Sequence, residues 1–400
     1  MPCTLASTFA HRASLLLSHR DVLEGRVQAR AVPAWCEERG WSEALLGLSN
    51  EALAGCEEHG LDIALADAPS VPSSLLAFAR ELRAATSVPA LSCDVPLDHA
   101  QTRRVRARKR LQLASLLAHA RELAQDAHRI VDVGTGHGHL PRLASADWKK
   151  QALGVDRDPT LLQAARGLAL GAQVQFRRMD VLEGSLVLEP GDLVMGLHAC
   201  GELGDAVLRH AASAAASVVL VSCCFQKVRA AWRRALSEQG QSLGVDLPHD
   251  ALGLANLSQR AMGVEASLTE TMHARTHRHA LRLLLRERGV PTRCGEEMRG
   301  INRRQALAGL EAIASKGLAL RNLGPASSQE LAHFAQAAEL DFGVMRRLSL
   351  PRAMLARLLE VTIVTDRAVF LEEHGYEVRV ATVFGAEVSP RNLGILARPA

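Results

Sequence analysis

The chain has 400 residues, of which 48% are apolar, 22% charged and 3% aromatic, and its formal net charge is +4. This composition is typical of a globular protein with an aliphatic core and excludes a disordered chain, while the charge excess is too small to identify a nucleic-acid partner. No apolar run approaches the ~18 residues that span a bilayer. Leu15–Leu17 is too short for the apolar core of a signal peptide. We therefore expect a cytoplasmic protein without membrane partners.

The eight cysteines are scattered along the chain and none forms a C-x-x-C pair. Zinc ribbons, zinc fingers and thioredoxin-like chemistry therefore have no support in the spacing. Scattered cysteines in a long chain without an export signal are expected to be reduced.

The first 98 residues carry short helical patterns interrupted by prolines and glycines, and they predict a helical N-terminal region over residues 1–98. A long amphipathic helix follows from about Gln101 to Gln125. Its apolar residues recur at helical spacing along one face. They are Leu113, Leu117, Ala120 and Ala124.

Five short apolar segments then alternate with helical stretches, which is typical of a parallel, doubly wound sheet. The predicted strands are Arg129–Val133, Ala152–Asp156, Val174–Arg177, Asp192–Leu197 and Ser217–Ser222. The clearest helices between them are Thr160–Ala169 and Glu202–Ala216. We expect an α/β, Rossmann-like core over residues 99–230.

Residues 231–364 interrupt this alternation and predict a helical insertion. Its clearest helices are Thr269–Arg288, Asn302–Ala314 and Ser328–Ala338. The stretch Ala353–His374 is ambiguous, because its β-branched run suggests a strand while its length and charged end favour a helix. Tyr376–Phe384 and Leu393–Ala397 then predict an antiparallel hairpin, so residues 365–400 would complete the core sheet.

A glycine-rich turn, Asp132-Val133-Gly134-Thr135-Gly136-His137-Gly138, follows the first predicted strand. Glycines at such a junction let the backbone turn sharply and let a ligand approach the amide groups. The D-x-G-x-G-x-G form resembles motif I of the class I methyltransferases, in which this loop borders the methionine part of S-adenosylmethionine. A nicotinamide-dependent oxidoreductase, in which such glycines hold a pyrophosphate, is the competing interpretation.

Acidic residues end the next two predicted strands. Asp156 lies 24 residues after Asp132, close to the ~20 expected for a carboxylate that accepts hydrogen bonds from ribose hydroxyls. Asp180 follows the third strand, where an adenine would lie. The predicted cofactor-binding residues, with their neighbours, are Asp132, Gly134, Thr135, Gly136, Gly138, Asp156, Arg157, Asp180, Val181 and His198.

The fourth and fifth predicted strands end in one histidine and three cysteines, which are the candidate catalytic residues His198, Cys200, Cys223 and Cys224. The carboxyl ends of parallel strands line the ligand crevice of a doubly wound sheet, so these side chains should converge. His198 could be a general base, with the cysteines as packing residues, or one cysteine could be a nucleophile. In a third interpretation the four bind zinc, but adjacent Cys223 and Cys224 should point in different directions along an extended chain. We therefore predict no metal.

Two groups of basic residues are candidates for substrate contacts. Arg103, Arg106 and Arg110 continue the apolar face of the long helix at its start, and Arg104, Arg108 and Lys109 widen this basic patch. A basic helix end can meet a phosphate or carboxylate, although most such faces are only solvated. Arg391 and Asn392 lie in the predicted hairpin turn, where Asn392 could equally serve to stabilise the turn. The predicted substrate-binding residues are Arg106, Arg110, Arg391 and Asn392.

Four segments taken together resemble the methyltransferase-like proteins typified by methyltransferase-like protein 25, whose relatives are also named ribosomal RNA adenine dimethylase domain-containing proteins. They are HRIVDVGTGHGHL, GLHACGEL, VLVSCCFQKV and VSPRNLGILARP, and the similarity extends to most of the chain. The resemblance implies a cofactor core at Asp132, the glycines and Asp156. It also implies that His198 and the three cysteines belong to the family signature. It further implies that the hairpin turn lies on the ligand side of the sheet.

The sequence thus predicts a methyltransferase that transfers a methyl group from S-adenosylmethionine, with RNA or protein favoured as the acceptor. The Asn- or Asp-Pro-Pro-aromatic motif of many amino-nitrogen methyltransferases is absent after the fourth strand, so adenine N6 chemistry is not expected. A catalytically silent module that binds RNA or the ribosome is the alternative from another functional class. Nothing in the sequence specifies an oligomeric state.

Overall fold

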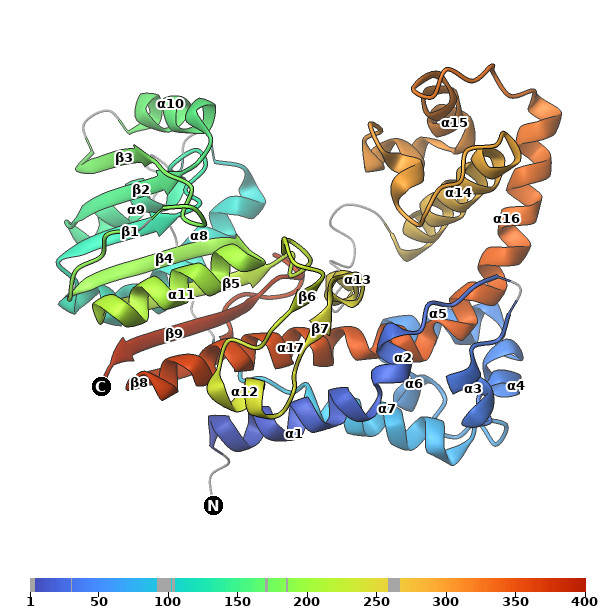
Figure 1. The fold of residues 1–400 in the computed structure, drawn as a ribbon, viewed down its shortest axis with the longest axis horizontal. Helices are drawn as coiled ribbons and strands as arrows, with labels where there is room; N and C mark the ends of the chain where they lie inside the picture. Colours follow the sequence, from blue (N-terminus) through green and yellow to red (C-terminus); the bar gives the residue numbers. More distant parts are fainter. Residues whose placement is uncertain are drawn as a thin grey trace. The chain divides into compact units, whose positions relative to one another are not determined.

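The computed structural model describes residues 4–29, 31–91, 102, 105–169, 172–184, 186–257 and 267–400. The chain forms two compact units, each assembled from separated stretches (Figure 1). Unit 1 comprises Met1–Glu24, Glu81–Arg260 and Ala353–Ala400, and unit 2 comprises Gly25–Arg80 and Ala261–Arg352. These divisions differ from the predicted boundaries at residues 98, 230 and 364, because pairing between distant stretches leaves no local sign in the sequence.

The core of unit 1 is a seven-stranded sheet in the order β3-β2-β1-β4-β5-β9-β8. Its strands are β1 (Arg129–Val133), β2 (Gln151–Asp156), β3 (Val174–Arg178), β4 (Asp192–Cys200), β5 (Ser217–Cys223), β8 (Tyr376–Thr382) and β9 (Leu393–Pro399). The first five run parallel, and β9 is antiparallel to both β5 and β8. This topology confirms the predicted Rossmann-like class I methyltransferase fold with its C-terminal hairpin. A separate two-stranded ribbon joins β6 (Trp232–Arg233) and β7 (Leu247–Pro248).

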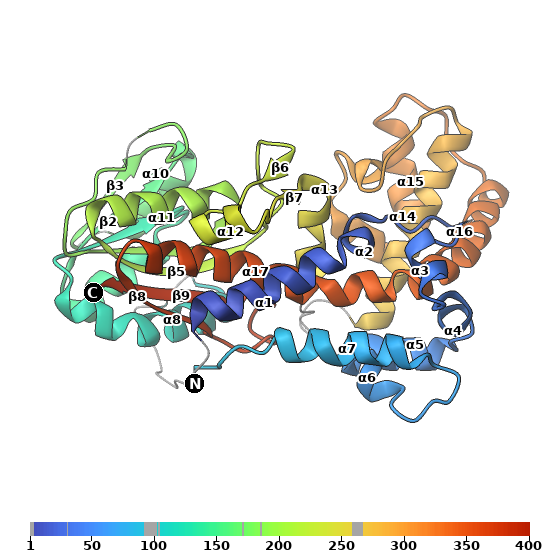
Figure 2. The same cartoon turned by 60° about the horizontal axis from the view of Figure 1, so that its bottom comes forward.

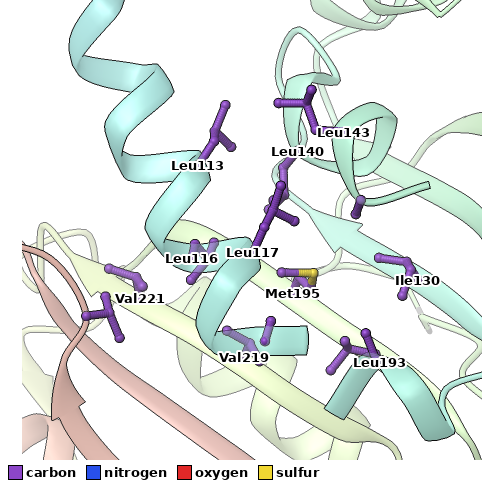
Figure 3. Close-up of a cluster of buried hydrophobic side chains, with 14 of the residues drawn as sticks. Leu113, Leu116, Leu117, Ile130, Leu140, Leu143, Leu193, Met195, Val219 and Val221 are labelled. Carbon is purple, nitrogen blue, oxygen red and sulfur yellow. The ribbon is translucent and has the colours of Figure 1, made fainter. Parts of the chain in front are cut away.

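One face of the sheet is covered by α8 (Ala107–Asp126) and α9 (His139–Trp148), which share a buried apolar cluster with the strands. Leu116 and Leu117 of α8 lie near Met195, Val219 and Val221 of the sheet (Figure 3), and Leu113 belongs to the same cluster. The predicted apolar face of this helix is confirmed, since all four of its residues are at most 1% exposed. Each fully buried leucine of this kind stabilises the fold by about 1.5–3 kcal/mol.

The opposite face is covered by α11 (Glu202–Ala214) and α17 (Leu350–Glu373). Ser222 alternates with Val221 along β5 and so faces away from the α8 cluster, and there it accepts a hydrogen bond from Arg367 of α17. The helix α1 (Leu5–Ser18) runs beside α17 (Figure 2), with Arg12 donating to the Thr365 hydroxyl at 2.8 Å. The ambiguous stretch is therefore a helix, because burial within unit 1 outweighs the low helix propensity of its β-branched run.

Four charged side chains form a buried network beneath this face. Arg367, with no exposed surface, donates to Asp205 of α11, to the Ser222 hydroxyl and to the Gly201 carbonyl, each at 2.7 Å. Arg233 donates to Asp366 at 2.8 Å and approaches Asp205 at 3.4 Å. Burial alone raises the pKa of Asp205, but Arg233 and Arg367 outweigh burial and hold it below the ordinary value. Two guanidinium groups and two carboxylates balance in charge, which is the condition for burying them.

Unit 2 is helical over the residues described. Its helices are α3 (Ala34–Glu38), α4 (Ser42–Leu46), α5 (Asn50–His59), α6 (Leu61–Ala64), most of α7 (Ser73–Ala85), α14 (Leu268–Glu287), α15 (Leu310–Ala319) and α16 (Ser328–Leu348). The predicted helix Asn302–Ala314 is wrong as a single element, because Gly309 at φ 109° separates a 3-10 helix (Arg303–Ala308) from α15. Arg346 pairs with Glu57 at 2.6 Å and so joins the two stretches of this unit.

The remaining helices of unit 1 are α2 (Arg20–Glu24), α10 (Pro159–Leu168), α12 (Glu238–Ser242) and α13 (His249–Leu252). Within the described part of the chain, every helix is too short or too polar to cross a membrane.

Replacing Arg367 with alanine should lower the free energy of unfolding by about 3–5 kcal/mol, because Asp205 then loses one of its buried cationic partners. The measurement is chemical denaturation followed by far-ultraviolet circular dichroism. Arg398→Ala is the matched control. It breaks an exposed pair with Glu377 and should change stability by no more than about 1 kcal/mol. Equal effects of the two substitutions would contradict a stabilising role for the network.

Candidate functional site

A pocket of about 430 Å³ lies at the carboxyl ends of β1, β2 and β4. This volume is within the range of small-molecule sites. Residues predicted from the sequence contribute much of its lining, and these are Gly134, Asp156, Arg157, Asp180, Val181, His198 and Cys200. The structure thus brings together six of the ten residues expected to bind the cofactor, whereas Asp132, Thr135, Gly136 and Gly138 are not among the lining residues.

The glycine turn is tied to the end of β2 by main-chain hydrogen bonds. The amide of Gly134 donates to the Val155 carbonyl at 2.9 Å, and the amide of Gly136 donates to the Asp156 carboxylate at 2.8 Å. Gly138, at φ 69°, leaves no space for a side chain, since a Cβ would lie 2.7 Å from the Phe176 ring. Backbone conformation and close packing therefore require glycine at the end of this turn.

The Asp156 carboxylate is held by main-chain amides and also lines the pocket. Its second oxygen accepts the Asp158 amide at 3.0 Å, and the side chain is partly exposed. Asp180 is positioned similarly, since its carboxylate accepts the Leu182 amide at 3.0 Å and lies 3.8 Å from the Arg157 guanidinium. Fixed carboxylates of this kind suit the recognition of hydroxyl groups and of an amino group.

Asp132 is only 2% exposed and does not line the pocket. Burial raises its pKa to about 6, against the opposing influence of Lys109. Burial also lowers the pKa of Lys109, which Asp132 and Cys223 partly offset. The sequence placed Lys109 only in a basic patch, because its charge gave no sign that the side chain is directed into unit 1 toward Asp132.

His198 occupies a strained position at the end of β4. Its φ is 73°, and the strand register shifts between Leu197 and Ala199. Its Nε2 lies 3.2 Å from the Gln112 side-chain oxygen on α8. Burial, followed by Lys109, lowers the pKa of His198 to about 4, so the ring is neutral at physiological pH. With the Gln112 side-chain oxygen as the acceptor, the ring proton is on Nε2 and Nδ1 is the acceptor.

The three cysteines of the predicted site form one cluster. Cys200 and Cys223 are register partners on β4 and β5, their sulfur atoms lie 2.8 Å apart, and the sulfur of Cys224 belongs to the same group within 4.8 Å. The expectation that Cys223 and Cys224 point in different directions is wrong. Cys224 has a φ of 36° and so leaves the extended conformation on which that expectation rested. Cys200 also lines the pocket, so this thiol cluster borders it.

Hydrogen bonds from Cys200 and Cys223 lower the pKa of the Cys224 thiol, and Lys227 and Arg391 act in the same direction. The thiols of Cys200 and Cys223 also donate to the His198 carbonyl, at 3.1 and 3.4 Å. Cys224 is the most acidic of the three.

The four predicted substrate-binding residues are not among those lining the pocket. Arg106 is exposed just before α8 and Arg110 is half-buried in its first turn, while Arg103 and Arg104 lie outside the described residues. Arg391 donates to the Ala255 carbonyl at 2.7 Å. Asn392 is 1% exposed and donates to the Phe384 carbonyl at 3.0 Å, so it stabilises the hairpin connection. A substrate role for these four residues stays a prediction.

Several residues of the pocket were not predicted. Apolar side chains form part of its wall, namely Val133, Val155, Met179, Leu182, Leu203 and Val228. Lys227 and Arg229 add positive charge after β5, with Arg229 3.3 Å from Glu183. Their position just beyond strand ends is the one sequence signal that could have identified them.

Asp132→Asn should raise the free energy of unfolding of the cofactor-free protein at pH 7.5 by up to about 3 kcal/mol. The folded pKa of Asp132, about 6, lies above the unfolded value of ~3.9. The stability that the protonated form brings is thus fully present below pH ~3.9 and is lost as the pH rises through about 6. Denaturation of both proteins across pH 4–8 is the measurement. A difference that does not shrink toward pH 4 would contradict the raised pKa.

Comparison with known proteins gives a domain match for the part of the chain that contains this site. Residues 108–231, which include β1 to β5, match the family model described as a methyltransferase domain. Among solved structures, the chain is similar to the amino pentose methyltransferase CalS10 from Micromonospora echinaspora, at 18% identity over 33% of this chain and 59% of that one, with a TM-score of 0.26. It is also similar to magnesium protoporphyrin IX methyltransferase from Synechocystis PCC 6803, at 19% identity over 37% of this chain and 66% of that one, with a TM-score of 0.25.

The alignments thus span less than two thirds of either solved chain. The family match confirms the predicted enzyme class for the matched residues and supports the predicted cofactor, S-adenosylmethionine. With the strand order of the sheet, it identifies residues 108–231 as the principal part of a class I methyltransferase domain.

Proposed function

We propose that the chain transfers a methyl group from S-adenosylmethionine to an RNA or protein acceptor. The observation that carries this proposal is a single pocket lined by Gly134 of the glycine turn after β1, by Asp156 after β2 and by Asp180 after β3. A ligand with a ribose between a base and a charged chain would meet all three. The more specific similarity to the methyltransferase-like protein 25 family belongs to the same proposal, as does the cytoplasmic location expected from the sequence.

Each part of the pocket suits one part of the cofactor. The Asp156 carboxylate, held by the Gly136 and Asp158 amides, has acceptor capacity left for ribose hydroxyls. Asp180 stands beside apolar side chains that can enclose an adenine. The glycine turn offers close backbone approach to the methionine end. When bound, the cofactor supplies a methyl group made electrophilic by a positively charged sulfur.

The protein's own contribution to such a transfer is to orient the acceptor and to accept a proton. His198 and Cys200 line the same pocket as the glycine turn, so they stand where an acceptor would meet the methyl group. The free Nδ1 of neutral His198 can accept a hydrogen bond or a proton from the acceptor. Holding the acceptor in line is the larger effect, because positioning supplies most of the rate enhancement in a simple displacement.

Charged side chains of both signs lie around the pocket. Arg157 and Arg229 are exposed there, at 74% and 59% of their side-chain surface, and Lys227 adds a third cation. Asp156, Asp180 and Glu202 line the same pocket, so its lining carries no excess of positive charge that would distinguish RNA from protein as the acceptor. Incorporation of tritiated methyl groups into cellular RNA and protein would separate these two acceptors.

Asp156→Ala should weaken adenosylhomocysteine binding about a hundredfold, because two hydrogen bonds to a charged group together contribute about 3 kcal/mol. Isothermal titration calorimetry measures the effect. Asp147→Ala is the matched control, since this carboxylate pairs with Arg121 away from the pocket, and it should bind like the wild type. Full binding by Asp156→Ala would rule out the ribose role, and no binding by the folded wild type would favour the silent module.

His198→Ala should reduce methyl transfer by about 10²-fold or more while leaving adenosylhomocysteine binding nearly intact, as expected for a group that acts on the acceptor proton. Single-turnover transfer from tritiated S-adenosylmethionine and calorimetry give the two readouts. His210→Ala on α11 lies outside the pocket and serves as the control. Unchanged transfer by His198→Ala would exclude the base role.

A further inference from the structure

The thiol cluster of Cys200, Cys223 and Cys224 has the composition and compactness of a metal site. Three ligand atoms lie within 4.8 Å of one another at the ends of two neighbouring strands. Sulfur atoms around a tetrahedral zinc ion lie about 3.8 Å apart, given Zn–S bonds of about 2.3 Å. The 2.8 Å separation of Cys200 and Cys223 would need to widen.

Three residues around the cluster, Cys224 among them, have an unusual backbone conformation. His198, Gly201 and Cys224 all have positive φ, at 73°, 52° and 36°. For His198 and Cys224 this conformation is strained, and such strain persists only where the surroundings enforce it. In an extended chain Cys224 would point away from Cys223. The strained turn therefore has a specific consequence, since it adds the third sulfur to the pair formed by the strand register.

The charges nearby suit a metal bound by three thiolates. Three thiolates and one divalent cation carry a net charge of −1. Lys227 and Arg391 act electrostatically on Cys224, and Lys109 interacts with Cys223. These three cations come from different elements, and together they offset the negative charge that a partly buried cluster would otherwise carry.

We propose that Cys200, Cys223 and Cys224 bind one thiophilic divalent cation, of which zinc is the expected one, beside the methyl-donor pocket. Thiolate ligands select zinc over magnesium, calcium and manganese. Among the residues that the structure describes, no fourth histidine, cysteine or carboxylate belongs to this group. Three protein ligands leave one coordination position open, as in catalytic rather than structural zinc sites. Because Cys200 lines the pocket, the ion would border the space for the acceptor.

This inference does not depend on methyl transfer, and its test is metal binding itself. The full-length chain, purified with reductant, is titrated with cobalt(II) and then with zinc(II). We expect one equivalent of cobalt to give sulfur-to-cobalt charge-transfer absorption of tetrahedral thiolate coordination, and zinc to remove it. Absence of this absorption in the reduced, folded chain would overturn the proposal. So would a Cys200–Cys223 disulfide that forms under these conditions and leaves no metal bound.

Substitutions identify the ligands. Cys200→Ser, Cys223→Ser and Cys224→Ser should each lose most of the cobalt absorption, whereas Cys294→Ser, at an exposed cysteine in unit 2, should keep it. Cys224→His retains a ligating side chain and should restore binding relative to Cys224→Ser, with an altered cobalt spectrum. Circular dichroism checks the fold of each variant. Equal cobalt absorption in the wild type and the three folded serine variants would contradict the assignment of these ligands.

Discussion

The buried guanidinium of Arg367 holds the carboxyl ends of β4 and β5 in place. Arg367 has no exposed surface, so all of its hydrogen-bonding capacity must be satisfied inside the protein. It donates to Asp205 on α11, to Ser222 one residue before Cys223, and to the carbonyl of Gly201 one residue after Cys200. The end of β4 and the end of β5 are thus held by one side chain that lies more than 140 residues later in the chain. Arg233 and Asp366 complete the charge balance.

This constraint explains how the site maintains conformations that an isolated chain would avoid. His198 and Cys224 are non-glycine residues with positive φ, a conformation that costs of order 1–3 kcal/mol each. His198 lies three residues before Gly201, and Cys224 lies two residues after Ser222, and Arg367 holds both Gly201 and Ser222. Burial then separates the roles of the ionisable groups. Asp132 lies away from water and has a raised pKa, whereas Asp156 and Asp180 remain accessible to a ligand from the pocket. His198 lines the same pocket but is buried enough for its pKa to fall to about 4.

The sequence was sufficient to predict the sheet, the glycine turn and the carboxylates after β2 and β3, because these depend on local periodicity and on the rule that strand ends line the crevice. It was not sufficient to predict features that depend on distant contacts. The pairing of Arg346 with Glu57 within unit 2 has no local signature. The buried position of Lys109 and the turn at Cys224 depend on packing around the site, and the failure at Gly309 arose because glycine at a helix boundary resembles glycine tolerated within a helix.

The place of β9 in the sheet has a consequence for synthesis of the chain on the ribosome. The apolar strand β5 is complete at Cys223, but its partner on the outer side begins only at Leu393. At ordinary rates of translation this interval is on the order of ten seconds or more. During that time the nascent chain presents an unpaired edge strand, which other chains can pair with. Unit 2 receives its last residue, Arg352, within the same interval. The helical unit can therefore finish folding while β5 still lacks its partner β9. Cotranslational chaperones would then bind a chain in which unit 2 is folded and the sheet of unit 1 is incomplete.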